Sequence, residues 1–596
     1  MKKNPFLNLF SFSWSYSPKK KFFVLYIVLS IVANSIDLFD MILVGRVFNS
    51  VQFDSADPGL LQYIITNLIL LILVKVGFWV FHGPARVLEM RNAFLVRKNY
   101  KQKMFNKVLE LPIEWQKDHH SGDTIDKINK SSEALFGFSE SLFLVITNVV
   151  SLVGSVIILS FFDWKMTIVA IVMPGLAIWT SIKFDKLLTK NYNKIYKAEN
   201  YLASAIHDYI SNIITIVSLR LKKKVSNEID SRSMASFDVF IKNNKLNELK
   251  WFSISFYLAL AVSGVLIFNA YYSYTTTGVI VIGTMYVLYS SLKNIGNFFF
   301  NFAWLYTDMT QKNEAVVLAE PINKAYNKTI IEKVSYGLPE DWRLLQIKNL
   351  FFSYKKKSDK DYIGDSLNDI SLTIEKNSKI ALIGESGSGK STILSLIRNL
   401  YNADKCDIYC DGKKLPNGLK HLREHTALIP QEPEIFNASV YDNITMDIKT
   451  KKTEVEKVIE FSKFDIVLNK LRRGLETNVL EKGVSLSGGE KQRLALARGL
   501  LMADNYDLLL LDEPTSSVDS DNELKIYINI FENYKNKTII SSIHRLHLLR
   551  YFDYIYFFEK GKIVTEGTFN TLLKDERFKL LWENYSKVKN EDAISK

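Results

Sequence analysis

The sequence predicts a membrane all-α domain of six helices with long cytoplasmic helical extensions, followed by an α/β domain of the P-loop NTPase type. Two observations predict this fold class. Six apolar segments occupy the first half of the 596-residue chain. In the second half, the stretch "IALIGESGSGKSTILSLI" at residues 381–398 places a glycine-rich turn between a strand-like run and a helical pattern. A chain of this length is too long for one hydrophobic core, so at least two domains are expected.

The six apolar segments each approach the ~20 residues that a helix needs to cross a ~30 Å hydrocarbon core. They lie at about 22–45, 60–82, 138–161, 164–184, 252–273 and 277–302. The sixth is the weakest at its inner end, where "SLKNIGNFFFNFAW" mixes polar and aromatic residues. The first follows a short basic lead without a small-residue cleavage pattern, so it is expected to be an uncleaved span rather than a signal peptide.

The connections between the spans alternate between short and long. The third and fourth spans are separated by about two residues, at "DW", and the fifth and sixth by a few residues, at "YTTT". The two long connections are rich in Lys and Arg and have apolar residues at helical spacing. Juxtamembrane positive charge, including Lys19, Lys20 and Lys21, places the long connections and both termini in the cytoplasm. The chain is therefore expected to be a multi-pass integral membrane protein of a prokaryotic inner membrane, with helices that continue into the cytoplasm.

The domain boundaries follow from changes in this pattern. Residues 1–320 form the expected transmembrane domain, and a polar linker covers 321–343 after Pro321. Short β-type runs alternating with helical runs predict a soluble α/β domain over 344–585, and 586–596 is a polar tail.

Charge and cysteine content leave few other functional classes. The net charge of +13 would suit nucleic acid, acidic lipid or cytoplasmic loops. Its concentration in the long connections favours the loops, and six apolar spans argue against a soluble nucleic-acid-binding ATPase. The only cysteines, Cys406 and Cys410, lie four apart on a predicted strand, roughly 13 Å from each other, which is too far for a disulfide.

The glycine-rich turn has the form G-x-x-x-x-G-K-S. Glycines let backbone N–H groups turn inward around phosphate oxygens, and the following helix N-terminus adds its partial positive charge. Lys390 is predicted to reach the β- and γ-phosphates, and Ser391 to bind Mg²⁺ through its hydroxyl. The residues predicted to contact ATP here are Gly384, Glu385, Ser386, Gly387, Ser388, Gly389, Lys390, Ser391 and Thr392.

A second motif, "DLLLLDEPTSSVD", ends a buried strand in two acidic residues. Asp512 is placed to hold the Mg²⁺ shell. Glu513, one residue beyond, is placed to polarise a water that faces the γ-phosphate. The alternative, a core strand followed by a surface acidic turn, is disfavoured because the glycine-rich motif is also present.

A third motif, "VSLSGGEKQRLALARGL" at 484–500, makes another anion cradle at a helix N-terminus. Within one domain it would be redundant, so it is expected to act on nucleotide held by another copy. With "LSGGE" followed by "KQR", the whole chain resembles the ATP-binding cassette (ABC) superfamily. Six spans followed by one cassette resemble an exporter-type half-transporter.

The resemblance implies further site residues by position. Tyr354 in "LFFSYKK" would stack on adenine, Gln431 in "LIPQEPEIF" would touch Mg²⁺, and His544 in "SSIHRL" would act as a switch near the γ-phosphate. "LPIEWQKDHHSGDTIDKI" resembles the first coupling helix, with Gly122 at the usual glycine, and "ETNVLEKGVSLSGG" resembles the linker before the signature. The signature and D-loop residues that would close on a partner's ATP are Ser487, Gly488, Gly489, Glu490 and Asp519.

The resemblance also implies a function and partners. The expected activity is ATP-driven export, or lipid flipping, of an amphipathic substrate by a dimer of half-transporters, with ATP and Mg²⁺ as cofactors and no nucleic acid partner. Intact motifs favour a homodimer over a heterodimer. An importer built on the exporter fold is the alternative, and lipid, peptide and small-molecule cargo all stay open.

Two acidic residues interrupt the first span. Asp37 and Asp40 in "NSIDLFDMILVG" share one helix face. Depth counted from Phe22 puts them in the outer third of the membrane, and Lys75 of the second span in the inner third, too distant to neutralise them. Either the span is shifted and both carboxylates lie near the outer surface, or they form an acidic patch that favours cationic cargo.

Overall fold

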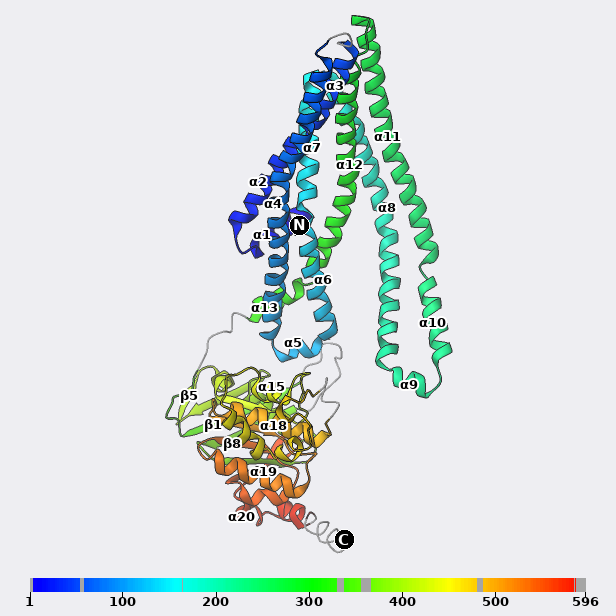
Figure 1. Ribbon diagram of the computed structural model, residues 1–596. Helices are drawn as coiled ribbons and strands as arrows, with labels where there is room; N and C mark the ends of the chain where they lie inside the picture. The colour runs from blue at the N-terminus through cyan, green and yellow to red at the C-terminus, as the bar shows by residue number, and fades with distance from the viewer. Residues whose placement is uncertain are drawn as a thin grey trace. The chain divides into compact units, whose positions relative to one another are not determined.

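The computed structural model describes residues 4–53, 58–119, 121–162, 164–329, 337–354, 366–479, 486–583 and 585. The chain forms two compact units (Figure 1). The first comprises residues up to Leu111 together with His119–Lys328, and the second comprises Pro112–Asp118 together with the chain from Thr329 onward. The short segment in the middle of the first unit's sequence therefore belongs structurally to the second.

The first unit is entirely helical over its described residues. Its helices are α1 (Pro5–Tyr16), α2 (Lys20–Asp37), α3 (Phe39–Phe53), α4 (Leu60–Leu109), α6 (Ser121–Glu140), α7 (Leu142–Phe162), α8 (Trp164–Ser211), α9 (Ile213–Ser218), α10 (Lys222–Met234), α11 (Phe237–Thr277), α12 (Ile282–Val317) and α13 (Glu320–Thr329). Helices α8 and α11 run side by side, and α9 and α10 close their far end (Figure 1). As expected from their helical pattern, the long connections are continuations of the spans.

Five helical segments of the described chain are long and apolar enough to cross a membrane: Lys20–Phe53, Leu60–Leu109, Ser121–Phe161, Thr167–Ser211 and Lys222–Thr277. The sixth expected span corresponds to α12, a continuous helix of 36 residues. Polar residues such as Ser291, Lys293 and Asn294 lower its apolar content. Many apolar side chains of the spans are exposed, as a lipid-facing surface requires.

Small residues bring two of these helices into close contact. A Cβ at Gly283 of α12 would lie 2.0 Å from the Gly45 carbonyl oxygen of α3, and one at Gly45 would lie 2.5 Å from Val287. The backbone amide of Gly283 also donates to the Asn49 side chain at 2.8 Å. Glycine at both positions lets the backbones approach, as in small-residue packing between membrane helices.

The expected separation of Lys75 from the aspartates is wrong. The Lys75 ammonium lies 2.7 Å from Asp37 Oδ1 and 3.4 Å from Asp40 Oδ2. The error came from ending the first span near residue 45, whereas α3 stays helical to Phe53. Counted from the turn of the hairpin, Asp37 lies about 16 residues before the end of α3 and Lys75 about 15 after the start of α4, so at ~1.5 Å per residue the two are level.

The boundary after the spans also differs from expectation. The helix does not stop at Pro321, because α13 begins at Glu320 and continues to Thr329, with the proline in its first turn where no amide hydrogen bond is lost. Part of the expected linker, residues 330–336, lies outside the described residues, as does Asp163 of the short "DW" connection.

The second unit contains α5 (Ile113–Asp118) and an α/β domain. Its strands are β1 (Leu344–Ser353), β2 (Ser366–Glu375), β3 (Lys379–Gly384), β4 (Lys405–Cys410), β5 (Lys413–Leu415), β6 (Thr426–Ile429), β7 (Leu508–Asp512), β8 (Thr538–Ser542), β9 (Tyr554–Glu559) and β10 (Lys562–Gly567). Its helices are α14 (Lys390–Ile397), α15 (Val440–Thr445), α16 (Lys452–Phe461), α17 (Asp465–Leu468), α18 (Gly488–Ala503), α19 (Ser520–Asn533) and α20 (Phe569–Leu572), with 3₁₀ turns at Gly418–His425, Gly474–Glu476 and Leu546–Tyr551.

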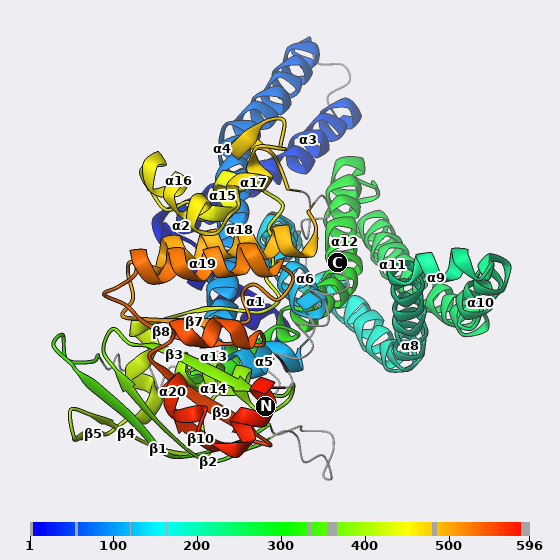
Figure 2. The ribbon, with the colours of Figure 1, turned by 90° about the horizontal axis from the view of Figure 1, so that it is seen from below.

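Two sheets organise this domain. An antiparallel sheet has the order β2-β1-β4-β5. A second sheet has the order β10-β9-β3-β8-β7-β6, parallel except for β10. The parallel sheet lies between α18 and α19 on one side and α14 with the antiparallel sheet on the other (Figure 2). Alternate residues of β3 pack into these two cores: Ala381 and Ile383 with α18 and α19, and Ile380 and Leu382 with α14 and the antiparallel sheet. Because β3 and β7 are buried, the loops at their carboxyl ends are held by a rigid sheet.

Candidate nucleotide-binding and catalytic site

The loop between β3 and α14 has a backbone that only glycine fits. Gly384, Gly387 and Gly389 have φ values of +144°, +80° and +109°. A Cβ at Gly384 would lie 2.2 Å from the Phe558 carbonyl oxygen. Within the described chain, the Ser388 hydroxyl inside this loop is buried without a hydrogen-bond partner. The loop therefore has the shape and an available polar atom for an anionic ligand at the N-terminus of α14.

Lys390 begins α14 and turns its side chain back across the loop. Its ammonium donates to the carbonyl oxygens of Gly384 at 2.8 Å and Glu385 at 3.0 Å. Burial lowers the pKa of Lys390, while the nearby carboxylates of Glu513 and Asp512 oppose that shift. The cation is thus held inside the loop, at two of its carbonyl oxygens.

Asp512, the last residue of β7, holds two hydroxyl groups. Its Oδ1 accepts from Ser391 at 2.9 Å and from Ser542 at 2.8 Å. Strand β7 is the neighbour of β8 in the parallel sheet. The two contacts therefore join the start of α14 and the ends of β7 and β8. Ser391 and Asp512, both predicted from sequence as Mg²⁺ ligands, are therefore adjacent.

Glu513 stands at the centre of a three-residue cluster. Its backbone has the unusual φ of +46°, and its amide donates to the Ser542 hydroxyl at 2.9 Å. One carboxylate oxygen lies 2.7 Å from His544 Nε2, and the other accepts from Gln431 Nε2 at 2.7 Å. Strained backbone of this kind occurs at functional sites when surrounding contacts hold it. The structure thus brings together Glu513, expected to polarise a water, with Gln431 and His544, which the family resemblance placed near Mg²⁺ and the γ-phosphate.

The pKa of Glu513 is raised, mainly by burial, and the neighbouring His544 and Lys390 partly counteract the rise. A carboxyl group whose pKa is shifted toward neutrality is a better proton acceptor near the working pH than an ordinary one.

Tyr354 lies beside the start of α14. Its hydroxyl is 3.3 Å from Thr392 Oγ1, and its ring packs edge-on against Phe352 and Tyr401 at centroid distances of 4.8 and 5.3 Å. The residue expected to stack on adenine is therefore positioned by an aromatic cluster next to the glycine-rich loop. Glu385 and Ser386 lie in the glycine-rich loop, and Thr392 lies in the first turn of α14.

The signature residues form a separate site. Ser487 caps α18 and exchanges hydrogen bonds with Glu490, whose carboxylate accepts from the Ser487 amide at 2.8 Å and whose amide donates to the Ser487 hydroxyl at 3.4 Å. A Cβ at Gly489 would lie 2.5 Å from the Ser517 carbonyl oxygen, so only glycine fits there. Residues 480–485 of the preceding segment lie outside the described chain.

Asp519 also acts as a helix cap rather than as part of the Glu513 cluster. Its carboxylate accepts from the backbone amide of Asn522 at 3.1 Å and from the Asn522 side chain at 2.7 Å, at the start of α19. Two groups of predicted site residues thus exist in one chain: one around Lys390 and Glu513, and one around Ser487.

Two positioning contacts were missed by sequence reasoning. Gln492 of α18 donates to the Ser516 hydroxyl at 2.7 Å and to the Gln431 carbonyl oxygen at 3.2 Å, and accepts from the Ser517 amide at 2.8 Å. It therefore ties the signature helix to the segments that flank the catalytic cluster. Its place in "KQR" next to the signature was the available signal.

The second missed contact involves the buried Glu523 of α19. Its carboxylate accepts from Thr515 at 2.8 Å and from Arg545 at 3.1 Å. Thr515 follows Glu513 by two residues and Arg545 directly follows His544, so one carboxylate connects the segments that carry Glu513 and His544. The arginine beside the histidine was the only sequence signal.

The helix α5 belongs to the same unit as this site. Ile113 packs against the core that contains Tyr401, and Lys117 donates to the Tyr401 hydroxyl at 2.5 Å. Tyr401 in turn packs against Tyr354. The segment predicted as a coupling helix is therefore two contacts away from the predicted adenine-stacking residue. Gly122, at the start of α6, is exposed, and a Cβ there would meet no other atom within 4 Å.

Comparison with known families supports this reading of both units. The family model described as "ABC transporter transmembrane region" matches residues 23–293, and the model described as "ABC transporter" matches residues 367–516. The transmembrane region and the ATP-binding region are therefore fused in this single chain.

Several curated proteins are similar along most of their length. The ATP-dependent lipid A-core flippase of Escherichia coli K12 is 28% identical over 498 residues, which cover 80% of each chain. A multidrug resistance ABC transporter ATP-binding and permease protein of Lactococcus lactis is 25% identical over 485 residues, again 80% of each chain. In fold, the chain resembles a bacterial Atm1-family ABC exporter with ATP bound, with a TM-score of 0.78, 19% identity, and coverage of 95% of this chain and 99% of that one.

Proposed function

Because this chain belongs to the ATP-binding cassette superfamily, as a half-transporter of the exporter type, we propose that its dimer exports an amphipathic substrate or moves a lipid between leaflets. The chain binds ATP and couples its hydrolysis to transport across the membrane. The observation that carries the proposal is the contact of Glu513 with both His544 and Gln431, in a chain whose described residues also include five apolar helical segments long enough to span a bilayer.

The glycine-rich loop and Lys390 hold the phosphates of ATP, and Tyr354 stacks on its base. The partnerless Ser388 hydroxyl and the glycine-only backbone fit an anion of this size. A charge-assisted contact from Lys390 strengthens binding more than a neutral donor would. When bound, ATP supplies the phosphoanhydride bond whose hydrolysis drives transport.

Ser391, Asp512 and Gln431 are the Mg²⁺ ligands in this proposal. They offer a hydroxyl, a carboxylate and an amide oxygen, and Mg²⁺ prefers such oxygen ligands, with one or two carboxylates completed by phosphates and water. The 2.9 Å contact between Ser391 and Asp512 already places two of the three side chains together. The ion supplies positive charge beside the phosphates.

Glu513 accepts the proton of the attacking water, and His544 orients its carboxylate. Burial raises the pKa of Glu513, which favours proton acceptance near neutral pH. The hydrogen bonds of Gln431 and His544 fix both carboxylate oxygens, so the base has little freedom to turn away from the water.

Two copies of the chain complete each ATP site. Ser487, Gly488, Gly489, Glu490 and Asp519 lie at helix starts that are not part of the Glu513 cluster, so a second copy can bring its signature to the nucleotide. In the first unit, α9 presents exposed apolar side chains at the end of the α8–α11 hairpin, including Ile213, Ile214 and Val217. An exposed apolar tip of this kind is typical of an interaction surface, and the second copy of this chain is its expected partner.

The test is transport by the purified protein in lipid vesicles. ATP added on the cassette side of inside-out vesicles should drive substrate into the vesicle lumen, and Glu513→Gln should abolish that accumulation. A panel of lipids, peptides and small amphiphiles identifies the cargo through its stimulation of ATP hydrolysis. ATP-dependent movement out of the lumen would indicate an importer instead.

A further inference from the structure

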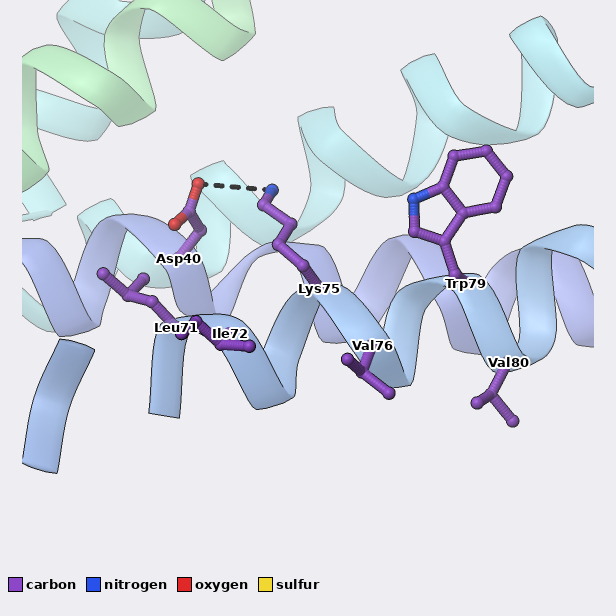
Figure 3. Close-up of a pocket in the computed structure, with 7 residues that line it drawn as sticks. All are labelled: Asp40, Leu71, Ile72, Lys75, Val76, Trp79 and Val80. Atoms are coloured by element: carbon purple, nitrogen blue, oxygen red, sulfur yellow. Dashed lines mark ion pairs between the residues drawn. The ribbon is translucent and has the colours of Figure 1, made fainter. Parts of the chain in front are cut away.

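A groove on the hairpin of α2, α3 and α4 combines ion-paired side chains with an apolar wall. The cavity has a volume of about 650 Å³ and is lined by Asp40, Leu71, Ile72, Lys75, Val76, Trp79 and Val80 (Figure 3). Ile72, Val76, Trp79 and Val80 are each 55% to 63% exposed. The groove therefore opens to the surface of the membrane-spanning region.

The local fold explains why both carboxylates face Lys75 of α4, beside this groove. Asp37 ends α2 and Asp40 lies in the first turn of α3, with Leu38 at the break between the helices. Leu38 is held on another side by α7, where a Cβ at Gly154 would lie 2.1 Å from its Cδ1. With Leu38 seated against that glycine, the two aspartates point toward α4.

Among the described residues, Lys75 is the one cation that forms ion pairs with Asp37 and Asp40. Lys75 lies 2.7 Å from Asp37 and 3.4 Å from Asp40, so one ammonium serves two carboxylates. Asp40, with the longer contact, lines the groove, whereas Asp37 does not. Charged groups within spanning helices are costly and are found where they bind ions or substrates. A second cation at Asp40 would balance the cluster.

The charge and shape of the groove determine which ligand would fit it. An anionic headgroup would meet a lysine already shared by two carboxylates and a net negative charge. A cationic headgroup would gain Asp40 and the face of Trp79, which stands on the same side of α4 as Lys75 (Figure 3). An alkyl chain would lie against Ile72, Val76 and Val80, which follow one another at i, i+4 spacing along the helix.

We propose that this groove binds a single-chain cationic amphiphile from the bilayer, with its ammonium at Asp40 and its alkyl chain along Ile72, Val76, Trp79 and Val80. The inference rests on the proposed export function, because it names a substrate class for it. It replaces the idea of an isolated acidic patch with an ion-paired cluster of net charge −1.

The experiment measures binding to the full-length protein in nanodiscs of zwitterionic lipid. The probes are a dansyl-labelled dodecylammonium and the matching uncharged dansyl-labelled dodecanol, detected by energy transfer from tryptophan. The parent should bind the ammonium probe at least about tenfold more tightly than the alcohol, the scale of one desolvated contact to a charged group. Asp40→Asn should reduce that preference to less than about twofold and leave affinity for the alcohol unchanged.

Two further variants make the result specific. Asp123→Asn removes an exposed carboxylate that pairs with Lys127 on α6, so it should keep the full preference. Trp79→Phe should reduce the energy transfer while the preference, measured by equilibrium dialysis, persists. Equal binding of both probes by the parent, or an unchanged preference in Asp40→Asn, overturns the proposal.

A third outcome also overturns it. If Asp40→Asn changes no probe affinity but shifts the protein from dimer to monomer, the groove is an interface between copies rather than a ligand site. Because binding is measured without ATP, a preference that depends on Asp40 in a protein that transports nothing would refute the export function and leave the groove assignment intact.

Discussion

At the residue scale, Glu513→Gln tests the assignment of the general base. Glutamine keeps the size of the side chain and its contacts near Gln431 and His544, but it cannot accept a proton. ATP turnover should fall by at least about 100-fold, the scale of lost general-base catalysis, while ATP affinity is retained. Steady-state phosphate release and nucleotide binding by the purified protein measure the two effects.

The control is Glu559→Gln, which changes an exposed glutamate that pairs with Arg577 at 3.8 Å. This variant should keep normal ATP turnover. Near-normal phosphate release in Glu513→Gln would exclude the role.

The pH profile gives an independent residue-scale prediction. Glu513 must be ionised to accept a proton, so turnover should fall as pH drops through its pKa. Burial raises that pKa, so the loss should begin at a higher pH than for an ordinary glutamate. His544 lowers the pKa of Glu513, hence His544→Ala should move the acid limb of kcat to still higher pH as well as slow the reaction. An acid limb that stays in place in this variant would show that the two groups are not coupled.

The glycine-rich loop, Asp512 and Glu513 could be predicted because their pattern is local, whereas Gln431 and His544 were expected only from the family resemblance. The backbone of the loop before Lys390 depends on glycines a few positions apart, and Asp512 and Glu513 end a strand that four leucines mark as buried. Gln492 and Glu523 escaped notice because their partners lie on other elements. Nothing in the order of residues indicates that Glu523 lies between Thr515 and Arg545.

At the scale of elements, the contact between α5 and the cassette predicts a coupling defect. Lys117 donates to the Tyr401 hydroxyl, and the Tyr401 ring packs against Tyr354. Tyr401→Phe removes the hydroxyl and keeps the ring, so ATP affinity and basal hydrolysis should change by less than about twofold. Stimulation of hydrolysis by transported substrate should decrease, because the link from α5 to the nucleotide-binding residue is weakened.

Lys117→Met is the matched variant, since it removes the same hydrogen bond from the other side. The two single variants and the double variant should show equal losses of stimulation, as expected for partners in one contact. Additive losses, measured as the ratio of stimulated to basal phosphate release, would show that the two side chains act separately.

The spans show where sequence reasoning at this scale succeeds and where it fails. Apolar runs predicted the spanning helices, and helical spacing in the long connections predicted that these helices continue beyond the spans, as α4 does over 50 residues. The pairing of Lys75 with Asp37 was missed because depth in the membrane was counted from the inner end of one span instead of from the turn of the hairpin. A change from apolar to polar residues does not show where α3 ends, because the helix continues past the apolar core to Phe53. The depth of each residue in the membrane therefore has to be counted from the turn that joins the paired helices.

At the scale of the whole molecule, the fusion of a membrane region with one cassette leaves each chain with half of a transporter. The Glu513 cluster and the Ser487 cap are each complete in their own hydrogen bonds, yet the chemistry proposed for the ATP site needs both. The proposed homodimer would supply both to each site, because two copies related by a twofold axis exchange the same pair of surfaces.

A heterodimer of two inactive variants tests that arrangement. Ser487→Ala chains and Glu513→Gln chains, carrying different affinity tags and purified in tandem, should form dimers in which one site is defective twice and the other is intact. The intact site pairs Glu513 of the first chain with Ser487 of the second. ATP turnover of this heterodimer should approach roughly half the parent rate if the sites work independently, and should exceed that of either variant homodimer.

Because Ser487 also caps α18, loss of stability in Ser487→Ala is monitored by thermal unfolding, with a cost of about 1 kcal/mol expected. A heterodimer rate no higher than the mean of the two homodimers would mean that each chain hydrolyses ATP with its own signature, and the shared site would then be wrong.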